Sequence, residues 1–419
     1  MLSIKHSVTL DISKCKGCTN CIKRCPTEAI RVRDGHAIIK EEKCIDCGEC
    51  IRLCPYKAKK AIYDKFEDFA DYKYKIALPA PTLYGQFEDL EDIDSILDAL
   101  LKCGFDAVYE VAKAAELVTE HTRRYMKQDN LPRPIISSAC PAIVRLIGLR
   151  FPCLVDHLLP IMPPIEYAAR EARREALEAH PELTDDDICV MFISPCPAKI
   201  SYIKNPLGVH NSAVTGGLSI SDFYFKIRSK RKDVQNPESL TSTGIIGLNW
   251  AGSGGEATSI LTDKYLAADG IENCIKILDE IENGTMSGLE FVELNACIGG
   301  CVGGTLTVEN PFIAKARLRS LRKYLPISCN RIGEDDAASG YVFYDADIDT
   351  NRADMLSEDR MTAIAKMVQI EEIYKGLPHL DCGSCGAPNC HALAEDIVKG
   401  EADISDCLIK LREEKNKNE

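Results

Sequence analysis

The pattern of apolar and polar positions changes twice along the chain. From about residue 76 to residue 330, apolar runs typical of buried strands alternate with stretches in which apolar positions recur every three or four residues, as on one helix face. The strand-like runs are residues 75–78, 134–136, 188–193, 244–248 and 289–294, and the clearest helical stretches are residues 91–101 and 163–178. Strands that alternate with helices predict an α/β domain.

The flanking regions have different patterns. Residues 1–72 show little helical periodicity and contain an internal repeat, whereas residues 331–376 hold a polar connection followed by a helix-like segment at 357–374. Residues 377–419 carry a final group of cysteines and end in a charged run. We therefore expect a small N-terminal domain (1–72), an α/β domain (73–330), a linker with a helix (331–376) and a small C-terminal domain (377–419).

Composition narrows the class of protein. The chain has 419 residues, which is more than a single hydrophobic core can accommodate. Its 21 cysteines lie mostly in tight groups. We expect neither a signal peptide nor a membrane span, because no basic-then-apolar leader and no run of about 18 apolar residues occurs. Clustered cysteines without an export signal favour metal binding over a disulfide scaffold. A net charge of −13 argues against nucleic acid as a partner.

The N-terminal repeat has the spacing of a two-cluster ferredoxin. Four cysteines separated by two, two and three residues, the last followed by proline, occur twice. In this arrangement the fourth cysteine of each run ligates the other cluster. One 4Fe-4S cluster is then expected on Cys15, Cys18, Cys21 and Cys54, and the other on Cys44, Cys47, Cys50 and Cys25. Zinc is the alternative, which the doubled spacing disfavours. Such clusters pass single electrons, so this domain predicts a redox partner.

Four further cysteines lie far apart within the α/β region. Cys140 and Cys196 each follow a strand-like run and sit beside proline, whereas Cys297 and Cys301 lie in a glycine-rich segment at 293–304. Cysteines four residues apart are expected on one side of a helical turn, and glycines let the backbone approach a bulky inorganic group. Sites in α/β sheets form at strand ends. These four thiols therefore predict another cubane cluster.

The tail contains a fourth group of cysteines. Cys382, Cys385, Cys390 and Cys407 resemble the small 4Fe-4S module of electron-transfer subunits and corrinoid proteins, with a helix at 392–398 that ends near Gly400. Four cysteines alone do not choose the metal, so zinc is the alternative. The remaining cysteines fit no ligand pattern and are expected to be buried reduced thiols: Cys103, Cys153, Cys189, Cys274 and Cys329.

The three motifs around the core cysteines, in this order and after a ferredoxin-like segment, resemble the signatures of the FeFe-hydrogenases. The resemblance implies two α/β lobes around an H-cluster: a 4Fe-4S cluster on the four core cysteines, with Cys301 bridging to a diiron unit that carries CO, CN and a dithiolate amine. It assigns Lys199 to one cyanide. It also implies that the diiron unit is contacted by Pro81, Thr82, Thr215, Gly216 and Gly217.

The chain departs from this family along the usual proton route. The family's proton-donating cysteine is Ala139 here, and its two relay glutamates and serine align with Thr122, Tyr125 and Leu159. Further motif positions that differ are Ser194, Asn295 and Tyr202. A missing general acid costs about 10²- to 10⁴-fold in rate. This pattern, with the extra tail cluster, resembles the FeFe-hydrogenases regarded as sensory. Candidates for a substitute proton path are Glu120, His121 and Glu256.

Three kinds of function remain open on the sequence. The first is a slow hydrogenase that interconverts H2 with protons and electrons and has a regulatory role. The second is an electron-transfer or assembly protein without the diiron unit, and the third is a module that binds hydrogen without useful turnover. The first predicts a redox partner such as ferredoxin and, because no output domain occurs, a separate signalling partner. The cytoplasm of an anaerobe is the expected location, with no nucleic acid and no membrane involved.

Overall fold

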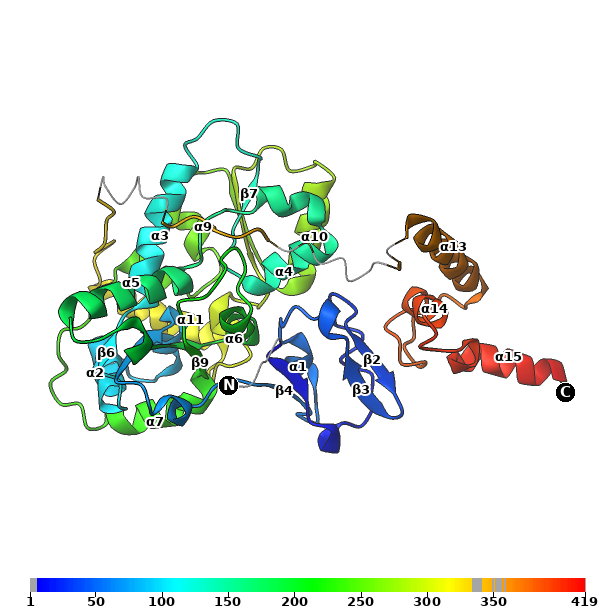
Figure 1. Cartoon of the computed structure of the whole chain (residues 1–419), viewed down its shortest axis with the longest axis horizontal. Helices are drawn as coiled ribbons and strands as arrows, with labels where there is room; N and C mark the ends of the chain where they lie inside the picture. Colours follow the sequence, from blue (N-terminus) through cyan, green and yellow to red (C-terminus); the bar gives the residue numbers. More distant parts are fainter. Residues whose placement is uncertain (1–5, 334–340, 349, 351–355, 358, 419) are drawn as a thin grey trace. The chain divides into compact units, whose positions relative to one another are not determined.

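The computed structural model describes residues 6–333, 341–348, 350, 356–357 and 359–418, and the chain forms two compact units (Figure 1). The first unit consists mainly of Ile62–Asp349 and includes the short segment Ile45–Cys47 and the N-terminus up to Ser7. The second consists of Val8–Cys44, Gly48–Ala61 and Thr350–Glu419. The predicted tail domain therefore belongs to the same unit as most of the N-terminal domain.

A four-stranded parallel sheet forms the first half of the first unit. Its strand order is β6 (Ala107–Val108), β5 (Tyr74–Pro79), β8 (Ile188–Ser194) and β9 (Gly216–Ser219). Side chains alternate between the two faces, as the two-residue period of a strand requires. Val190 packs with helices α3 (Val111–Tyr125) and α5 (Pro164–Ala179), whereas Met191 packs with α2 (Asp94–Lys102) and α7 (Ile220–Arg231). Cover on both faces explains why β8 is apolar from Ile188 to Ile193.

A second parallel sheet faces the first across a shared core. Its order is β10 (Tyr265–Asp269), β11 (Phe291–Asn295) and β7 (Ile135–Ile136). Ile135 and Phe291 belong to the same core as Val190, whereas Ile136 and Val292 pack with helices α4 (Pro141–Arg150) and α10 (Ile271–Glu282). The predicted α/β class is confirmed, and the two parallel sheets agree with the expectation of two α/β lobes.

Several elements differ from the sequence-based expectation. Residues 244–248 were expected as a strand, but this prediction is wrong because they lie at helix α8 (Ile245–Asn249). Its Gly247 packs so closely on α3 that a Cβ there would lie 2.1 Å from the Ala112 carbonyl oxygen. A short apolar run satisfies either a buried strand or a buried helix, so periodicity could not decide. Strands β6, β9 and β10 were not predicted.

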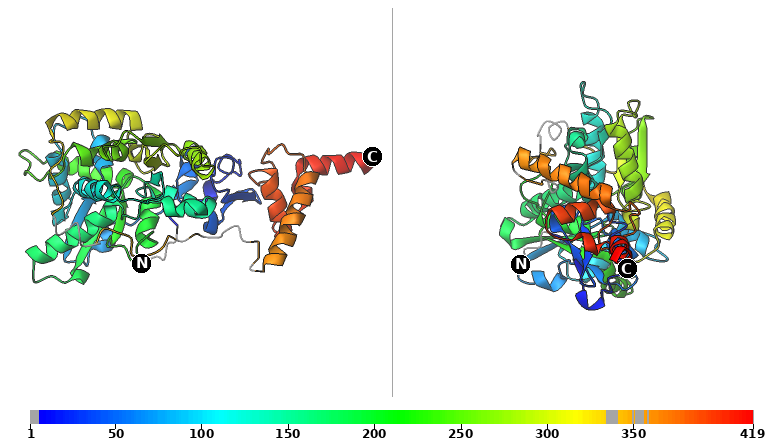
Figure 2. Two further views of the ribbon diagram at one scale, coloured as in Figure 1. Left: turned by 90° about the horizontal axis from the view of Figure 1, so that it is seen from above. Right: turned by 90° about the vertical axis from the view of Figure 1, so that its right-hand side faces the viewer.

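Within its described residues, the second unit contains two small antiparallel strand pairs and three C-terminal α-helices. Strand β1 (Val8–Leu10) pairs with β4 (Lys59–Ala61), and β2 (Ile30–Arg33) pairs with β3 (His36–Ile39). The short helix α1 (Glu49–Leu53) lies between β3 and β4 in the sequence. In the tail, helix α13 (Arg360–Gly376) packs against α14 (Cys390–Val398), and α15 (Leu408–Asn418) follows (Figure 2). Part of the predicted linker at 331–376 lies outside the described residues.

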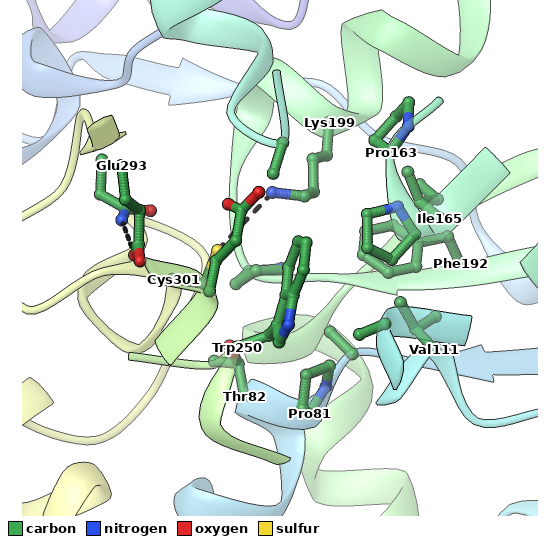
Figure 3. Close-up of a pocket in the computed structure, with 17 residues that line it drawn as sticks. Pro81, Thr82, Val111, Pro163, Ile165, Phe192, Lys199, Trp250, Glu293 and Cys301 are labelled. Atoms are coloured by element: carbon green, nitrogen blue, oxygen red, sulfur yellow. Dashed lines mark hydrogen bonds between the residues drawn. The ribbon is translucent and has the colours of Figure 1, made fainter. Parts of the chain in front are cut away.

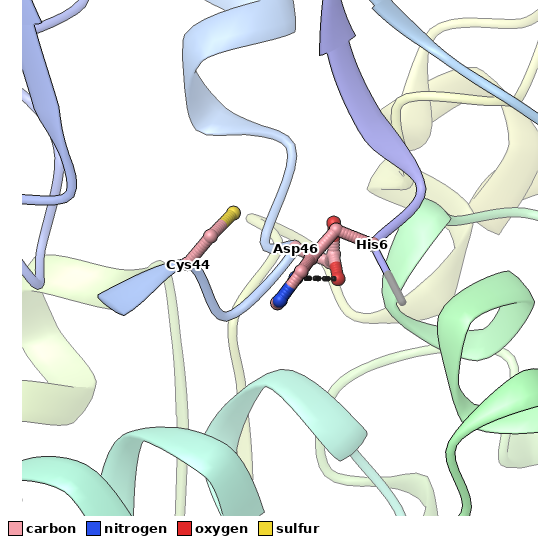
Figure 4. A group of neighbouring side chains, drawn as sticks. All are labelled: His6, Cys44 and Asp46. Carbon is pink, nitrogen blue, oxygen red and sulfur yellow. Dashed lines mark hydrogen bonds and ion pairs between the residues drawn. The ribbon is translucent and has the colours of Figure 1, made fainter. Parts of the chain in front are cut away.

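A buried carboxylate fixes the short segment of the ferredoxin repeat that belongs to the first unit. Asp46 accepts hydrogen bonds from the ring of His6 at 3.0 Å (Figure 4) and from the Ser7 amide at 3.1 Å. Arg145 of helix α4 lies 3.6 Å from the same carboxylate. A buried charge needs such partners to offset its lost hydration. No helix in the described residues is long and apolar enough to cross a bilayer.

Candidate functional site

A pocket in the first unit lies where the parallel strands of both sheets end. The chain leaves β5 into Ala80–Thr82, β7 into 137–140, β8 into 195–196 and β11 into 297–301, so the predicted ligand segments all follow carboxyl ends of strands. The pocket (Figure 3) is mostly apolar, with a few polar groups. Its lining residues are Ala80, Pro81, Thr82, Val111, Ala115, Ala139, Pro163, Pro164, Ile165, Phe192, Pro195, Lys199, Trp250, Glu256, Glu293, Asn295 and Cys301.

Lys199 and Cys301 face each other in this pocket (Figure 3). The Lys199 ammonium lies 3.6 Å from the Cys301 sulfur. Burial alone would lower the pKa of Lys199, but the neighbouring thiols, Cys301 foremost, outweigh it and raise that pKa above its usual value. A lysine held in its charged form beside a cysteine sulfur suits an anionic group in the pocket.

Three of the core cysteines surround this lysine. The charges of Cys301, Cys196 and Cys140 all act on the pKa of Lys199, and Cys297 lies four residues before Cys301 on the same loop. The expected helical turn between Cys297 and Cys301 is wrong: turns and bends precede a 3-10 helix at Cys301–Gly303. The glycines explain this path, since Gly300 has φ +87° and a Cβ there would lie 2.3 Å from the Ser253 amide nitrogen.

Two buried carboxyl groups, Glu256 and Glu293, also line the pocket. Burial raises the pKa of Glu256 to about 8, and the nearby charge of Glu293 adds to the rise. Glu293 is held by the backbone amides of Gly254 and Ala257, and burial also raises its pKa. Two carboxyl groups in one apolar site cannot both ionise easily, so the pair holds a proton near neutral pH.

A serine connects this pair to the position of the missing cysteine. The Ser137 hydroxyl donates to Glu256 Oε2 at 2.5 Å and accepts from the Ala139 amide at 3.2 Å. Asn295, which departs from the family motif, donates to Glu293 at 2.7 Å. Glu293 and Ser137 were not among the sequence candidates. The only sequence signal was their position, since Ser137 directly follows β7 and Glu293 lies within β11, and many structural residues share such positions.

Thr82 and Pro81 reach the pocket as expected, whereas three other predicted contacts do not. The Thr82 hydroxyl is fully buried and has no hydrogen-bond partner among the described residues, as expected of a group that contacts a bound ligand. Thr215, Gly216 and Gly217 were predicted as a loop over the diiron unit. Gly216 and Gly217 instead form strand β9, where a Cβ on Gly216 would lie 2.1 Å from the Phe69 ring, and Thr215 bonds Arg173 and Val190.

Two of the three proton-path candidates lie away from the pocket. Val111 and Ala115 are the residues of helix α3 that line it, and the helical period turns Glu120 and His121 to other directions. Glu120 accepts a hydrogen bond from the Ile332 amide, and the His121 ring centroid lies 6.1 Å from that of Tyr167. Only Glu256 of this set reaches the pocket.

Four of the ferredoxin-like cysteines and the four tail cysteines line separate cavities of the second unit. Cys15, Cys18, Cys21 and Cys54 share one cavity, which fits the expected exchange of the fourth ligand between runs. Another cavity contains all four tail cysteines: Cys382, Cys385, Cys390 and Cys407.

The cysteines without a ligand pattern divide into two groups. Cys103, Cys189 and Cys274 are buried, as expected of structural thiols. The expectation is wrong for Cys153 and Cys329, which are exposed. Cys153 donates to a Glu282 carboxylate oxygen at 2.8 Å, and this hydrogen bond raises the pKa of its thiol.

Fold and site together define an α/β protein with a thiol-lined, largely apolar pocket and separate iron–sulfur segments. The family model "Iron only hydrogenase large subunit, C-terminal domain" matches residues 73–239 and 210–305, more than half of the chain. A "4Fe-4S dicluster domain" matches residues 7–55, and a "Putative Fe-S cluster" model matches residues 377–409. The chain belongs to the iron-only hydrogenase large-subunit family, as its motifs indicated.

Known proteins agree with this assignment. The periplasmic [Fe] hydrogenase large subunit of Nitratidesulfovibrio vulgaris is 26% identical, over 71% of this chain and 86% of the relative. An apo [FeFe]-hydrogenase variant from Chlamydomonas reinhardtii has the same fold, with a TM-score of 0.51 at 14% identity, over 70% of this chain and 98% of that one. A second variant gives a TM-score of 0.50 at 14% identity, over 69% and 97%.

Proposed function

We propose that the chain is a slow FeFe-hydrogenase that interconverts H2 with protons and electrons at an H-cluster and has a regulatory, hydrogen-sensing role. The observation that carries the proposal is the pocket in which Cys301, the charged Lys199 and the unpartnered Thr82 hydroxyl converge. A thiolate, a cation and a free hydroxyl donor together match an anionic group linked to iron through sulfur. When bound, the diiron unit supplies the metal at which H2 is split or formed.

The residues of the chain suit separate parts of this task. Cys140, Cys196, Cys297 and Cys301 would hold the 4Fe-4S part, and Cys301 would also bridge to the diiron part. Lys199 would neutralise an anionic ligand, Thr82 would donate a hydrogen bond to another, and Phe192, Ile165 and Trp250 would exclude water.

Protons would reach the pocket through Ser137 and Glu256. The Ser137 hydroxyl joins Glu256 Oε2 to the loop that carries Ala139, where the family places its thiol. A carboxyl group with a pKa near neutral can both give and accept a proton at working pH. Ala139 itself cannot carry one, so transfer must cross a longer gap than in the family, and slow turnover follows.

Slow turnover suits a reporter better than a producer of H2. The ferredoxin-like and tail clusters would connect the pocket to a redox partner such as ferredoxin, and a separate partner would receive any signal. We place this activity in the cytoplasm of an anaerobe.

The alternative is an iron–sulfur electron-transfer or assembly protein without the diiron unit. One feature of the sequence favours it: Ala139, Ser194 and Asn295 stand where the family places other side chains around the diiron site. In that case the pocket would stay empty, and the buried Thr82 hydroxyl would have no ligand to bond.

A hydrogen-uptake assay tests the proposed activity. Full-length protein produced together with the hydrogenase maturation enzymes should reduce a viologen dye under H2, about 10²- to 10⁴-fold more slowly than relatives with the proton-donating thiol. Protein made without the maturation enzymes is the control and should show no uptake. Infrared CO and CN bands without any uptake would contradict the enzyme and favour a module that only binds hydrogen.

A further inference from the structure

A charged interface joins the tail to the ferredoxin-like segment within the second unit. Asp396 of helix α14 is fully buried and accepts hydrogen bonds from three cations. Arg31 and Arg33 of strand β2 bind it, with Arg31 in a bidentate pair, and the Lys40 ammonium lies 3.0 Å from Oδ1. All three donors come from the N-terminal segment, more than 350 residues away in sequence.

The charges around this contact are complementary. Burial would raise the pKa of Asp396, but the hydrogen bonds from Arg31 and Lys40 outweigh it, and the pKa is lowered. Lys43 lies 3.4 Å from Glu395, and Lys40 also lies 2.7 Å from Glu401. Basic side chains therefore stand on the ferredoxin-like side and acidic ones on the tail side. Loss of one partner from such a buried cluster leaves unpaired charges and is strongly destabilising.

Backbone contacts bring the tail's cysteine loop directly onto strand β2. The Val32 amide donates to the Gly386 carbonyl at 2.8 Å, and Arg33 donates to the carbonyl of the ligand Cys385 at 2.8 Å. Gly386 has φ +81°, and a Cβ there would lie 1.9 Å from the Val32 carbonyl oxygen. Only glycine permits this approach. On the same loop, Asn389 donates to Glu28 at 2.6 Å.

The same strand borders a ferredoxin-like cluster cavity. Val32 lines the cavity that contains Cys15, Cys18, Cys21 and Cys54, while its amide bonds the tail loop. A single residue thus touches both the first cluster's cavity and the loop that carries Cys382 and Cys385. Electron transfer between clusters requires such close, fixed ligand loops, and a tail tethered only by a linker would not provide them.

We propose that Asp396 is the positioning residue of an internal docking interface, which fixes the tail cluster next to the cluster on Cys15, Cys18, Cys21 and Cys54. One electron passes from a reduced cubane at one of these sites to an oxidised cubane at the other, without proton transfer or bond cleavage. The tail is then an extension of the electron chain and not an independent module. The proposal rests on cluster binding in the second unit and is independent of hydrogen chemistry at the pocket.

Full-length protein with reconstituted 4Fe-4S clusters tests this interface without the diiron unit. After reduction with dithionite, electron paramagnetic resonance should show magnetic interaction between the tail cluster and its neighbour. Asp396→Asn should remove the interaction and give the tail cluster the spectrum of an isolated cubane. In the same variant, hydrogen exchange at the Val32 amide should accelerate by about 10²-fold, because the tail no longer protects it.

Two further variants separate docking from folding of the tail. Arg33→Gln combined with Lys40→Gln weakens the interface from the opposite side and leaves the tail sequence intact, so it should reproduce both effects at wild-type iron content. Asp403→Asn, an exposed acid of the same tail, should change neither. An isolated-cubane spectrum in the wild-type protein would overturn the proposal. So would unchanged spectra and Val32 exchange in the double variant.

Discussion

Glu256→Gln should lower hydrogen turnover by about 10²- to 10⁴-fold, the usual cost of losing a general acid or base. Glutamine keeps the shape of the side chain and an oxygen that accepts from Ser137, but it cannot take up or release a proton. The pH dependence should change with it. With a Glu256 pKa of about 8, H2 evolution needs the protonated form and should fall as the pH rises through that value. In the glutamine variant this inflection should disappear.

Glu120→Gln is the matched control for this experiment. Glu120 lies on helix α3 outside the pocket and accepts a hydrogen bond from the Ile332 amide. Turnover of the Glu120→Gln variant should therefore stay within about two-fold of the wild type. Viologen-coupled turnover between pH 5 and pH 10 measures both variants. A Glu256→Gln enzyme with unchanged rate and unchanged pH profile would remove Glu256 from the proton route.

Ala139→Cys should raise turnover by up to about 10²-fold, because it restores an ionisable group at the position nearest the reacting centre in this family. A thiol has a pKa of about 8.5 and exchanges protons readily near neutral pH. Ala139 already lines the pocket, and its amide bonds Ser137, so a thiol there would join the existing Ser137–Glu256 connection.

Ala139→Ser separates the effect of the proton from the effect of size. Serine is similar in volume to cysteine, but its hydroxyl does not ionise at working pH and can only pass a proton along a hydrogen bond, so turnover of the Ala139→Ser variant should rise less than that of Ala139→Cys. If cysteine gives no gain in protein with wild-type infrared bands, proton delivery does not limit the rate. A slow step elsewhere, such as electron exit, would then have to explain the low turnover.

Much of the architecture followed from local patterns. The strands at β5, β8 and β11 were recognisable because each is an apolar run buried on at least one face, and the cysteine spacing of the ferredoxin-like repeat pointed to shared ligands that line one cavity. The run at 244–248 was misread, because a strand and a short buried helix look alike over five residues. Strand β9 was missed since its two glycines, required beside Phe69 and Ile200, resemble a loop.

The site was harder to predict than the fold, because its polar groups come together only through tertiary structure. Cys301 and Lys199 were found through motifs. Glu293 was not, because it reads as an ordinary strand residue until the fold places it beside Glu256. The ion pairs of Asp396 with Arg31, Arg33 and Lys40 were not predicted for the same reason. The sequence of helix α14 does not indicate that it packs against strand β2.

Infrared spectroscopy of matured wild-type protein shows whether the pocket of Cys301 and Lys199 holds a diiron unit. CO and CN stretching bands are absent from every other part of a protein, so they report the diiron unit in the pocket of Cys301 and Lys199. We expect these bands in matured protein, no such bands in protein made without maturation enzymes, and a shift of the bands under H2. Matured protein that contains its full iron–sulfur complement but shows no such bands would contradict the hydrogenase assignment.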